Sequence, residues 1–252
     1  MKKMISLALI VLGTIFVNFS FGQNDSIKLP FTKTSDKDGM FHAKADGSPL
    51  YGSKKKPMRF KQISEFQIVE GDTLAWVENF DKKFFHIKPN GKPAYTQKYI
   101  SVGEFTNGLA IAENSSGKFH IRKDGKPLYP KVYIEVRSFN DGLAAVENEE
   151  GDAFFIDTTG YQPKSWSKEK FQNIGDFVNG CTWIQDHKDK FFFVNIHGSL
   201  VLGDNTFKSI EADPYEPGKF TAKCDSSFVT IIIEKDNTIK MVIAENPKRK
   251  KK

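Results

Sequence analysis

The stretch Asn107-Gly-Leu-Ala-Ile-Ala-Glu-Asn114 decides the fold, because its pattern recurs along the chain. Further copies begin at Asp72, Asp141 and Asn179, and each runs for eight residues to a final Asn or Asp. Self-similarity at a spacing of roughly 20 to 50 residues is the sequence signature of repeat architectures. The sequence therefore predicts a tandem repeat protein.

A second element follows each copy and places an aromatic residue, an apolar residue and a turn glycine in a fixed order. It is clearest in Phe85-His-Ile-Lys-Pro-Asn-Gly91 and in Phe119-His-Ile-Arg-Lys-Asp-Gly125. Six such segments occur, with anchors 34 to 44 residues apart, so we expect about six units. The anchors are Phe41, Phe85, Phe119, Phe154, Phe192 and Ile231.

A third element has aromatic and apolar residues at intervals of three. Each unit is then one supersecondary element that has to stack on its neighbours to bury these side chains. The sets are Phe60/Ile63/Phe66, Tyr99/Val102/Phe105, Tyr133/Val136/Phe139, Phe171/Ile174/Phe177 and, in part, Phe207/Ile210.

Alternation with period two, and many β-branched and aromatic residues, indicate strands within each unit. In the first element Leu109 and Ile111 alternate with alanines, so both faces are apolar and we expect burial on two sides. In the second element Phe119 and Ile121 form one apolar face, and the opposite face carries His120. Beyond the apolar run near the N-terminus (Ile5 to Phe19), no stretch shows apolar residues at the spacing of one helix face. The predicted fold is all-β, with about three antiparallel strands per unit.

Turn chemistry separates these strands. Ser115-Ser116-Gly117 and Asp124-Gly125 are typical of tight turns between antiparallel strands. A proline follows the second turn in four units, which predicts an edge strand or an irregular segment there. These prolines are Pro49, Pro93, Pro127 and Pro163.

The units resemble the WG repeat family, in which an aromatic residue, Gly-Leu-Ala, an aromatic strand, a turn glycine, a proline and a tyrosine follow one another. The resemblance is carried by Phe105 to Ala110 followed by Phe119 to Tyr129, and by Phe139 to Ala144, and it covers most of residues 31 to 243. The Trp-Gly pair that names the family is absent, and Lys118-Phe119 stands in its place. The resemblance implies an all-β repeat protein, often exported, with no enzymatic residues to carry over.

The arrangement of the units has two alternatives. Closure into a propeller-like ring removes exposed sheet edges, which favours the ring slightly. An open array of hairpins is the other arrangement, and degenerate units near Phe31 and Phe220 are typical of its capping units.

The N-terminus has the features of a bacterial-type signal peptide. Two lysines precede an apolar run from Ile5 to Phe19, and Ser20-Phe21-Gly22 offers small residues for cleavage. We expect a signal peptide over 1–22, a short linker over 23–30, and a repeat domain over 31–246. The apolar run is shorter than the roughly 18 residues that span a bilayer. We therefore expect no stable membrane insertion after cleavage, with an uncleaved anchor as the alternative, and a periplasmic or extracellular location.

The formal charge of +6 overstates the charge of the folded part. Of 37 basic residues two lie in the leader and five in Lys248–Lys252, which leaves 30 against 31 acidic residues between Gln23 and Pro247. A nucleic-acid partner requires a basic face on the folded domain, so none is expected. The basic tail over 247–252 is predicted to be a disordered, solvated end, with a weak tether to an anionic surface as the alternative.

Three histidines in one register, His42, His86 and His120, suggest a zinc site at first sight. The same register holds Phe155 and Phe193 in later units, which indicates a flat or apolar filler. Equivalent positions in stacked sheets also lie roughly 10 Å apart, too far for a shared zinc ion. We therefore predict no metal site and no cofactor.

A column of carboxylates, Glu78, Glu113 and Glu147, could suggest acid–base chemistry. Each glutamate ends a strand beside an asparagine, where a charge is ordinarily solvated, so the structural interpretation is preferred. Asp36-Lys-Asp38-Gly39 resembles half of a calcium loop but lacks its remaining ligands, and it is interpreted as a turn.

Three tryptophans and two cysteines complete the candidates. Trp76 and Trp183 could offer stacking platforms but are more typical of a core, whereas Trp166 lies in a polar stretch and is the better candidate for an exposed contact. Cys181 is expected to be a small buried residue, and its pairing with Cys224 is left open.

The functional prediction is an exported, non-enzymatic repeat scaffold that binds an unknown protein or an envelope polysaccharide. No catalytic residue is assigned, and the ligand-binding residues are unknown. The alternatives are an envelope-directed hydrolase with an unrecognised site and a structural component of a larger assembly.

Overall fold

The computed structural model describes residues 31–166, 169–225 and 227–243. The predicted signal peptide (1–22), linker (23–30) and basic tail (247–252) lie outside these residues, so those predictions stay untested.

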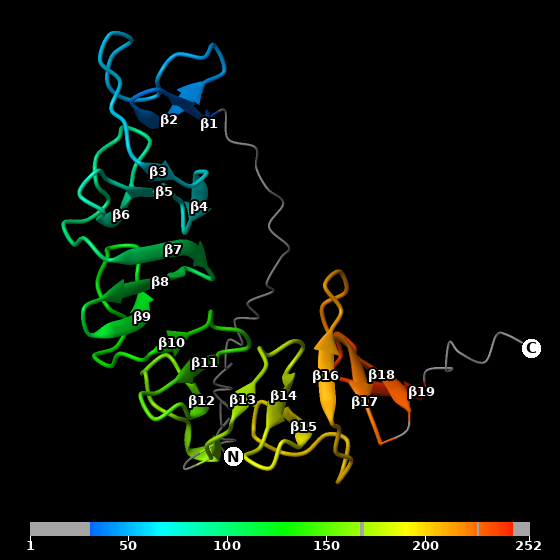
Figure 1. Cartoon of the computed structure of the whole chain (residues 1–252). Helices are drawn as coiled ribbons and strands as arrows, with labels where there is room; N and C mark the ends of the chain where they lie inside the picture. Colours follow the sequence, from blue (N-terminus) through cyan, green and yellow to red (C-terminus); the bar gives the residue numbers. More distant parts are fainter. Residues whose placement is uncertain (1–30, 167–168, 226, 244–252) are drawn as a thin grey trace, which may run out of the picture. The chain divides into compact units, whose positions relative to one another are not determined.

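The described chain is all-β, as predicted, and it forms six separate antiparallel sheets (Figure 1). The only helical segment described is the 3-10 turn η1 (Lys164–Trp166). The first three sheets hold β1 (Phe31–Asp36) and β2 (Gly39–Lys44); β3 (Gln62–Ile63), β4 (Gln67–Val69), β5 (Asp72–Glu78) and β6 (Phe84–Ile87); and β7 (Ser101–Thr106), β8 (Leu109–Asn114) and β9 (Gly117–Ile121). The last three hold β10 (Glu135–Val136), β11 (Ala144–Glu147) and β12 (Ala153–Ile156); β13 (Asn173–Ile174), β14 (Cys181–Gln185) and β15 (Phe191–Asn195); and β16 (Ser209–Ala212), β17 (Lys219–Lys223), β18 (Phe228–Ile233) and β19 (Ile239–Ile243).

The three predicted elements combine across a repeat boundary. In the third sheet the third element of the preceding unit forms β7, the first element forms the central strand β8, and the second element forms β9. The turn between β7 and β8 is Asn107-Gly108, and both residues have positive φ, at 53° and 78°. An Asn-Gly pair in this conformation suits a two-residue hairpin, because its twist matches that of the flanking strands.

A β-bulge explains why the third element repeats every three residues and not every two. The register of β7 on β8 shifts between Val102 and Phe105. Strict alternation would put these two side chains on opposite faces, and one extra residue returns them to the same face. Tyr99, Val102 and Phe105 are all at most 8 % exposed. In the second sheet the outer strand is broken at the same point into β3 and β4, which both pair with β5.

The central strands are buried less evenly than predicted. On β8, Ala110 and Ala112 are almost fully buried, but Leu109 and Ile111 are only half-buried. Two-sided burial is therefore wrong for β8, because its larger side chains lie toward a surface hollow that Leu109 lines. The prediction of burial on both faces is confirmed for β11, whose Ala144, Ala145 and Val146 are at most 5 % exposed.

Each sheet is tied to the next by a single antiparallel bridge. Tyr99, just before β7, exchanges two backbone hydrogen bonds with Phe84 at the start of β6, at 2.9 and 3.0 Å. The other sheet-joining bridges are Met40–Phe60, Lys118–Tyr133, Ala153–Phe171 and Phe191–Phe207. No strand of the first sheet pairs with a strand of the last among the described residues.

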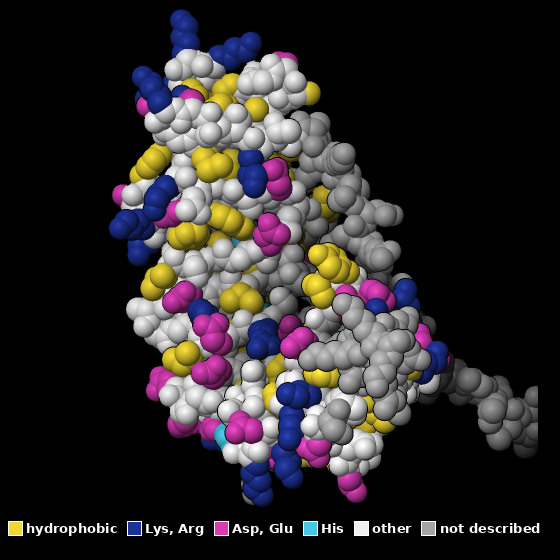
Figure 2. All heavy atoms as spheres, turned by 45° about the vertical axis from the view of Figure 1, so that its right-hand side comes forward, with side chains coloured by type: hydrophobic (Ala, Val, Ile, Leu, Met, Phe, Trp, Pro, Cys, Tyr) yellow, Lys and Arg dark blue, Asp and Glu magenta, His cyan; other side chains and the backbone are white. Residues whose placement is uncertain are grey.

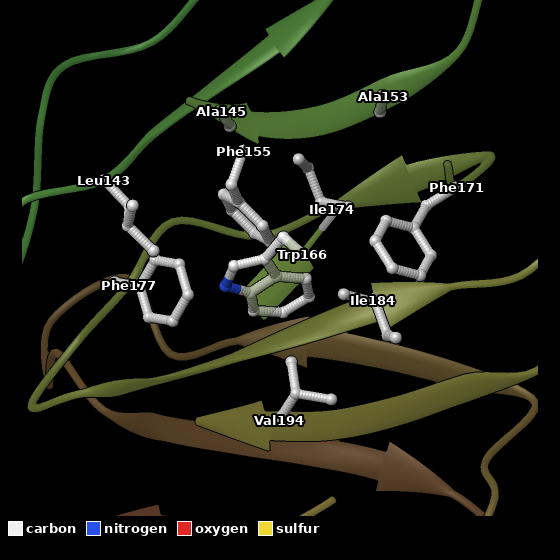
Figure 3. Close-up of a cluster of buried hydrophobic side chains, with 10 residues drawn as sticks. All are labelled: Leu143, Ala145, Ala153, Phe155, Trp166, Phe171, Ile174, Phe177, Ile184 and Val194. Atoms are coloured by element: carbon white, nitrogen blue, oxygen red, sulfur yellow. The ribbon is translucent and has the colours of Figure 1, made fainter. Parts of the chain in front are cut away.

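Aromatic side chains fill the space between consecutive sheets. Between the fourth and fifth sheets, Trp166 lies among Phe155, Phe171 and Phe177 (Figure 3). Its ring centroid is 4.9 Å from that of Phe155 and 6.1 Å from that of Phe171. This packing confirms that the units bury their recurring phenylalanines against one another.

The prolines after the second turn mark irregular edges, as predicted. Pro49, Pro93 and Pro127 each form one isolated bridge to the neighbouring strand, and no regular strand follows them. Among the described residues, no helix is long and apolar enough to cross a membrane.

Replacing Gly125 by alanine is expected to destabilise the fold far more than replacing Gly142. Both glycines have positive φ, at 75° and 82°, so both substitutions carry a backbone cost of about 1 kcal/mol. A Cβ at Gly125 would also lie 2.3 Å from the Tyr95 ring, whereas one at Gly142 meets nothing within 4 Å. We predict a loss of about 3 kcal/mol or more in unfolding free energy for Gly125→Ala, measured by urea denaturation. Equal losses for the two variants would contradict this packing.

Candidate functional site

A buried histidine joins each of the first three sheets to the next. In the second sheet, His86 on β6 has its Nδ1 2.6 Å from the Tyr95 hydroxyl and its Nε2 3.1 Å from the carbonyl oxygen of Gly103 on β7. The ring also packs on Phe105, with centroids 4.5 Å apart. We call this set of histidine, tyrosine and accepting carbonyl the His–Tyr joint.

The joint fixes the tautomer of the histidine. A carbonyl oxygen can only accept, so Nε2 of His86 carries the proton and donates it to Gly103. Nδ1 is then unprotonated and accepts the hydroxyl proton of Tyr95. The hydroxyl oxygen in turn accepts the backbone N–H of His86 at 3.2 Å. Every polar group of the joint is therefore satisfied with a neutral ring.

The same joint occurs at the boundary before this one, between the first and second sheets, and at the boundary after it, between the third and fourth sheets. His42 lies 2.8 Å from both the Tyr51 hydroxyl and the Ser64 carbonyl oxygen. His120 lies 2.7 Å from the Tyr129 hydroxyl, and its Nε2 is 3.0 Å from the carbonyl oxygen of Arg137. All three histidines are at most 1 % exposed: His42, His86 and His120.

Burial holds these histidines in the neutral form. It lowers the pKa of His86 and of His120 to about 4, because the charged ring would lose its hydration, and the hydrogen bonds to Gly103 and Arg137 offset only part of this. The pKa of His42 is lowered for the same reason. Burial also raises the pKa of Tyr51 to about 12. The filler interpretation was correct about burial, but it missed the hydrogen bonds.

The tyrosines fix the spacing between sheets as well. The ring of Tyr95 lies against Gly125, at the second turn of the third sheet, and Tyr129 lies against Gly160 in the same way. A second tyrosine, Tyr133, donates its hydroxyl proton to the carbonyl oxygen of Gly160 at 2.8 Å. A tyrosine nine residues after each histidine, and the turn glycine one unit later, are the signals by which the sequence could have revealed the joint.

The fourth unit replaces the joint by an apolar contact. Phe155 stands in the register of the histidines and packs on Phe177, with centroids 4.7 Å apart. Trp166 takes the place of the tyrosine beside the turn of Gly198, and its Nε1 donates to the carbonyl oxygen of Ile196 at 2.9 Å. Trp166 is only 1 % exposed, so its prediction as an exposed contact is wrong. Its neighbours in sequence are polar, but η1 turns the indole inward (Figure 3).

The glutamate column is spread over three sheets and is less solvated than predicted. Glu78 on β5 is 4 % exposed and forms an ion pair with Lys61 at 2.7 Å, so the solvated interpretation is wrong for it. Glu113 on β8 is half-buried and accepts the Ser101 hydroxyl proton at 2.9 Å. Glu147, on β11, is also half-buried. Glu78 and Glu113 therefore each bind a side chain of their own sheet.

The remaining candidates have structural environments. Asp36 accepts the backbone N–H of Asp38 at 2.9 Å and pairs with Arg59, which confirms the turn at the supposed calcium loop. Cys181 is buried and Cys224 half-buried, and both thiols are free. No cluster of three or more histidine, cysteine, aspartate or glutamate side chains that could hold a metal ion occurs in the part of the chain described.

Hollows lie between consecutive sheets, and two of them combine residues that suit ligand binding. The first, about 390 Å³, is lined by Glu70 of the second sheet and by Asn107 and Lys123 of the third. Lys123 is 3.0 Å from Asp72 and 3.7 Å from Glu70, so its charge is neutralised across the boundary.

The second hollow, about 290 Å³, lies between the fifth and sixth sheets. The half-buried Trp183 lines it together with Asp176, Asp213 and Lys219, and Arg137 reaches it from the preceding sheet. Trp76 has the same position on β5 as Trp183 on β14, and it is half-buried too. An aromatic face beside charges of both signs suits a polar ligand with apolar patches, such as a sugar or a peptide.

Replacing His120 by alanine is expected to cost more stability than replacing it by phenylalanine. Alanine leaves a cavity and strands the Tyr129 hydroxyl and the Arg137 carbonyl, which together cost about 4 kcal/mol. Phenylalanine keeps the ring packing that Phe155 shows in the fourth unit, so we expect a loss of about 2 kcal/mol. Urea denaturation at pH 7.5 measures both, and equal losses would show that the ring packing contributes nothing.

Acid is expected to weaken the joints between pH 6.5 and about 4. An unfolded histidine binds its proton near pH 6.5, whereas folded His86 and His120 bind theirs near 4. The unfolded state therefore binds more protons in this window, and stability falls as the pH falls. At pH 5.5 each of the two histidines should account for a loss of about 1.4 kcal/mol relative to pH 7.5. The His120→Phe variant should lose about that much less over the same interval, and an unchanged pH dependence would contradict the buried neutral state.

Solved structures that resemble this chain match it at low sequence identity. BamB from Moraxella catarrhalis matches at 11% identity and a TM-score of 0.41, over 83% of this chain and 70% of that chain. Hsv2p from Kluyveromyces lactis matches at 10% identity and a TM-score of 0.45, over 86% and 82%. The WD40 β-propeller domain of Doa1 matches at 11% identity and a TM-score of 0.35, over 87% and 90%. No curated protein matches the sequence.

The family comparison addresses the repeat itself. Residues 121–150, from the end of β9 to the turn after β11, match the family model described as WG containing repeat. This segment includes Tyr129 of one joint and the Asp141-Gly142 turn that opens the next copy of the eight-residue pattern. The resemblance to the WG repeat family is thereby confirmed, and the match lies within residues 121–150.

Proposed function

We propose that this repeat protein is an exported, non-enzymatic scaffold that binds a partner protein in the periplasm or outside the cell. The proposal rests on the different roles of two groups of residues in each repeat, those that join the sheets and those that line the hollows. The residues that recur, above all the histidines and tyrosines of the joints, are used to hold one sheet on the next. The first hollow is lined in part by the recurring Asn107 and Leu109, but Lys123 beside them corresponds to Pro89 in the second sheet and to Thr158 in the fourth.

The surface suits a protein partner. Charges of both signs and small hydrophobic patches alternate on the face drawn in Figure 2. Exposed apolar side chains recur at equivalent places, such as Ile100 before β7 and Ile134 before β10, which are 46 % and 47 % exposed. A mixed surface with scattered apolar anchors is typical of non-obligate protein interfaces. The sequence of the leader supports export.

An envelope polysaccharide is the second candidate, and the hollow beside Trp183 favours it. An indole face next to Asp176 and Arg137 could stack on a sugar ring and bond its hydroxyl groups. The hydrolase alternative is not favoured, because the column glutamates lie in separate sheets, and Glu78 is tied to Lys61.

Pull-down from envelope extracts with the purified chain, at low and high salt, tests the proposal. We expect one protein to be retained saturably at both salt concentrations, and to bind again after both components are purified. The Trp183→Ala variant should keep this partner, whereas loss of binding to envelope polysaccharide in this variant, but not in Trp76→Ala, would favour the second candidate. Release of small sugar products by the wild type would contradict the proposal.

A further inference from the structure

The last sheet ends in a strand that the earlier sheets lack. After the second turn, β19 (Ile239–Ile243) pairs with β18 over five residues, from Ile233–Ile239 to Val229–Ile243. In the third sheet the equivalent segment makes only one bridge, Ile121–Pro127. β19 is the outermost strand of its sheet, so its far edge has no partner among the described residues.

A proline closes this edge in the first three sheets. In the third sheet, Arg122 donates its N–H to the Lys126 carbonyl and Leu128 donates to the His120 carbonyl, at 2.9 and 2.8 Å. Lys126 and Leu128 thus face the sheet, and Pro127 between them faces outward, because these directions alternate along an antiparallel strand. A proline at an outward position removes a free N–H without breaking the ladder. Pro49 and Pro93 occupy equivalent bridges.

The same alternation leaves β19 open. The N–H of Glu234 donates to the carbonyl of Thr238 at 2.8 Å, so Thr238 and Lys240 face β18. The backbone N–H and C=O groups of Ile239 and Met241 therefore point away from the sheet. Ile239 stands where the first three sheets have proline. The side chains of Met241 and Val242 are 45 % and 54 % exposed, so this edge is both unpaired and apolar.

Charge distinguishes this end of the chain from the rest. From Glu234 to Ile243 the sequence has two basic and two acidic residues, and the nine residues that follow β19, which lie outside the described part, add five basic residues and one acidic residue. Glu234, one of these acids, is already paired with Lys240 at 2.7 Å. The five basic residues that follow β19 in the sequence would attract a strand with acidic flanks, and a second copy of this chain would bring the same positive charge.

We propose that the outer edge of β19 is a docking site for an extended segment of a partner protein, which adds a fifth strand to the last sheet and carries acidic residues beside an apolar core. Main-chain hydrogen bonds to Ile239 and Met241 supply the affinity, and the exposed Met241 and Val242 select apolar side chains. The inference rests on the proposed scaffold function and deepens it.

Binding of labelled strand peptides to the purified full chain tests the site. Three fluorescein-labelled peptides share a Val-Thr-Val-Thr-Val core and differ in their flanks, which are Asp-Glu, Ser-Ser or Lys-Lys. Fluorescence anisotropy should show the acidic peptide binding at least about tenfold more tightly than the basic one, with the neutral peptide between them. Hydrogen exchange at the amide of Met241 should slow on binding.

The variants separate pairing from simple hydrophobic contact. Met241→Pro removes an outward N–H and no hydrogen bond to β18, so the sheet should remain folded while peptide affinity falls at least about tenfold. Ile239→Pro, which installs the residue found in the first three sheets, should do the same. Met241→Thr keeps the backbone donor and should lose less than about threefold.

Several outcomes would overturn the inference. These are no saturable binding of any peptide, equal binding of the acidic and basic peptides, or unchanged affinity in both proline variants. A wild-type dimer in sedimentation that Met241→Pro converts to a monomer would assign the edge to a second copy instead. If Met241→Pro still retains the partner found in envelope extracts, the scaffold function stands and only this site is wrong.

Discussion

The first four sheets depend on one short-range constraint, which is that a buried neutral histidine bridges each of the first three sheets to the next. His86 and its equivalents accept from a tyrosine in their own unit and donate to a carbonyl in the next. Backbone hydrogen bonds between sheets are otherwise few, since one bridge ties each described sheet to the following one. A hydrogen bond between groups that are both buried is directional and costly to leave unmade, so it fixes the distance and orientation of the sheets.

In the fourth unit an aromatic contact replaces the His–Tyr joint, so a comparison with this unit shows what the joint contributes. Phe155 and Trp166 occupy the places of the histidine and the tyrosine, and only the indole N–H retains a polar contact with the next unit. The aromatic packing is thus the common element of the boundaries, and the hydrogen bonds are specific to the first three. Residues that serve the boundaries are constrained in this way, whereas some that line the hollows, such as Lys123, differ from unit to unit. We regard this variation as the physical basis for a scaffold with a selective surface.

Much of the fold could be predicted from the sequence, because each unit repeats the same solution. The eight-residue pattern around Asn107 and the aromatic triplets set the strands and their order, and the turn prolines marked irregular edges. The register of the third element could not be predicted, since a search for alternating apolar residues does not detect the bulge between Val102 and Phe105. Trp166 was misplaced because its neighbours in sequence are polar while its contacts are distant. Glu78 was misjudged for the same reason, as Lys61 lies 17 residues away.

The candidate sites were harder to predict than the fold. A column of histidines could be recognised as filler, but its hydrogen bonds depend on tyrosines in the segments that the prolines made irregular. The fourth strand of the last sheet also escaped prediction, because it appears where the repeat pattern stops. Both features lie after the second turn of a unit, outside the three elements whose recurrence predicted the strands.

The most direct test of the account is the tautomer and titration of the joint histidines, measured by ¹⁵N NMR of the ring nitrogens between pH 7.5 and 5. The account predicts that His86 and His120 keep a protonated Nε2 and an unprotonated Nδ1 throughout this range. Titration of these rings near pH 6.5, or a proton on Nδ1 at neutral pH, would contradict it.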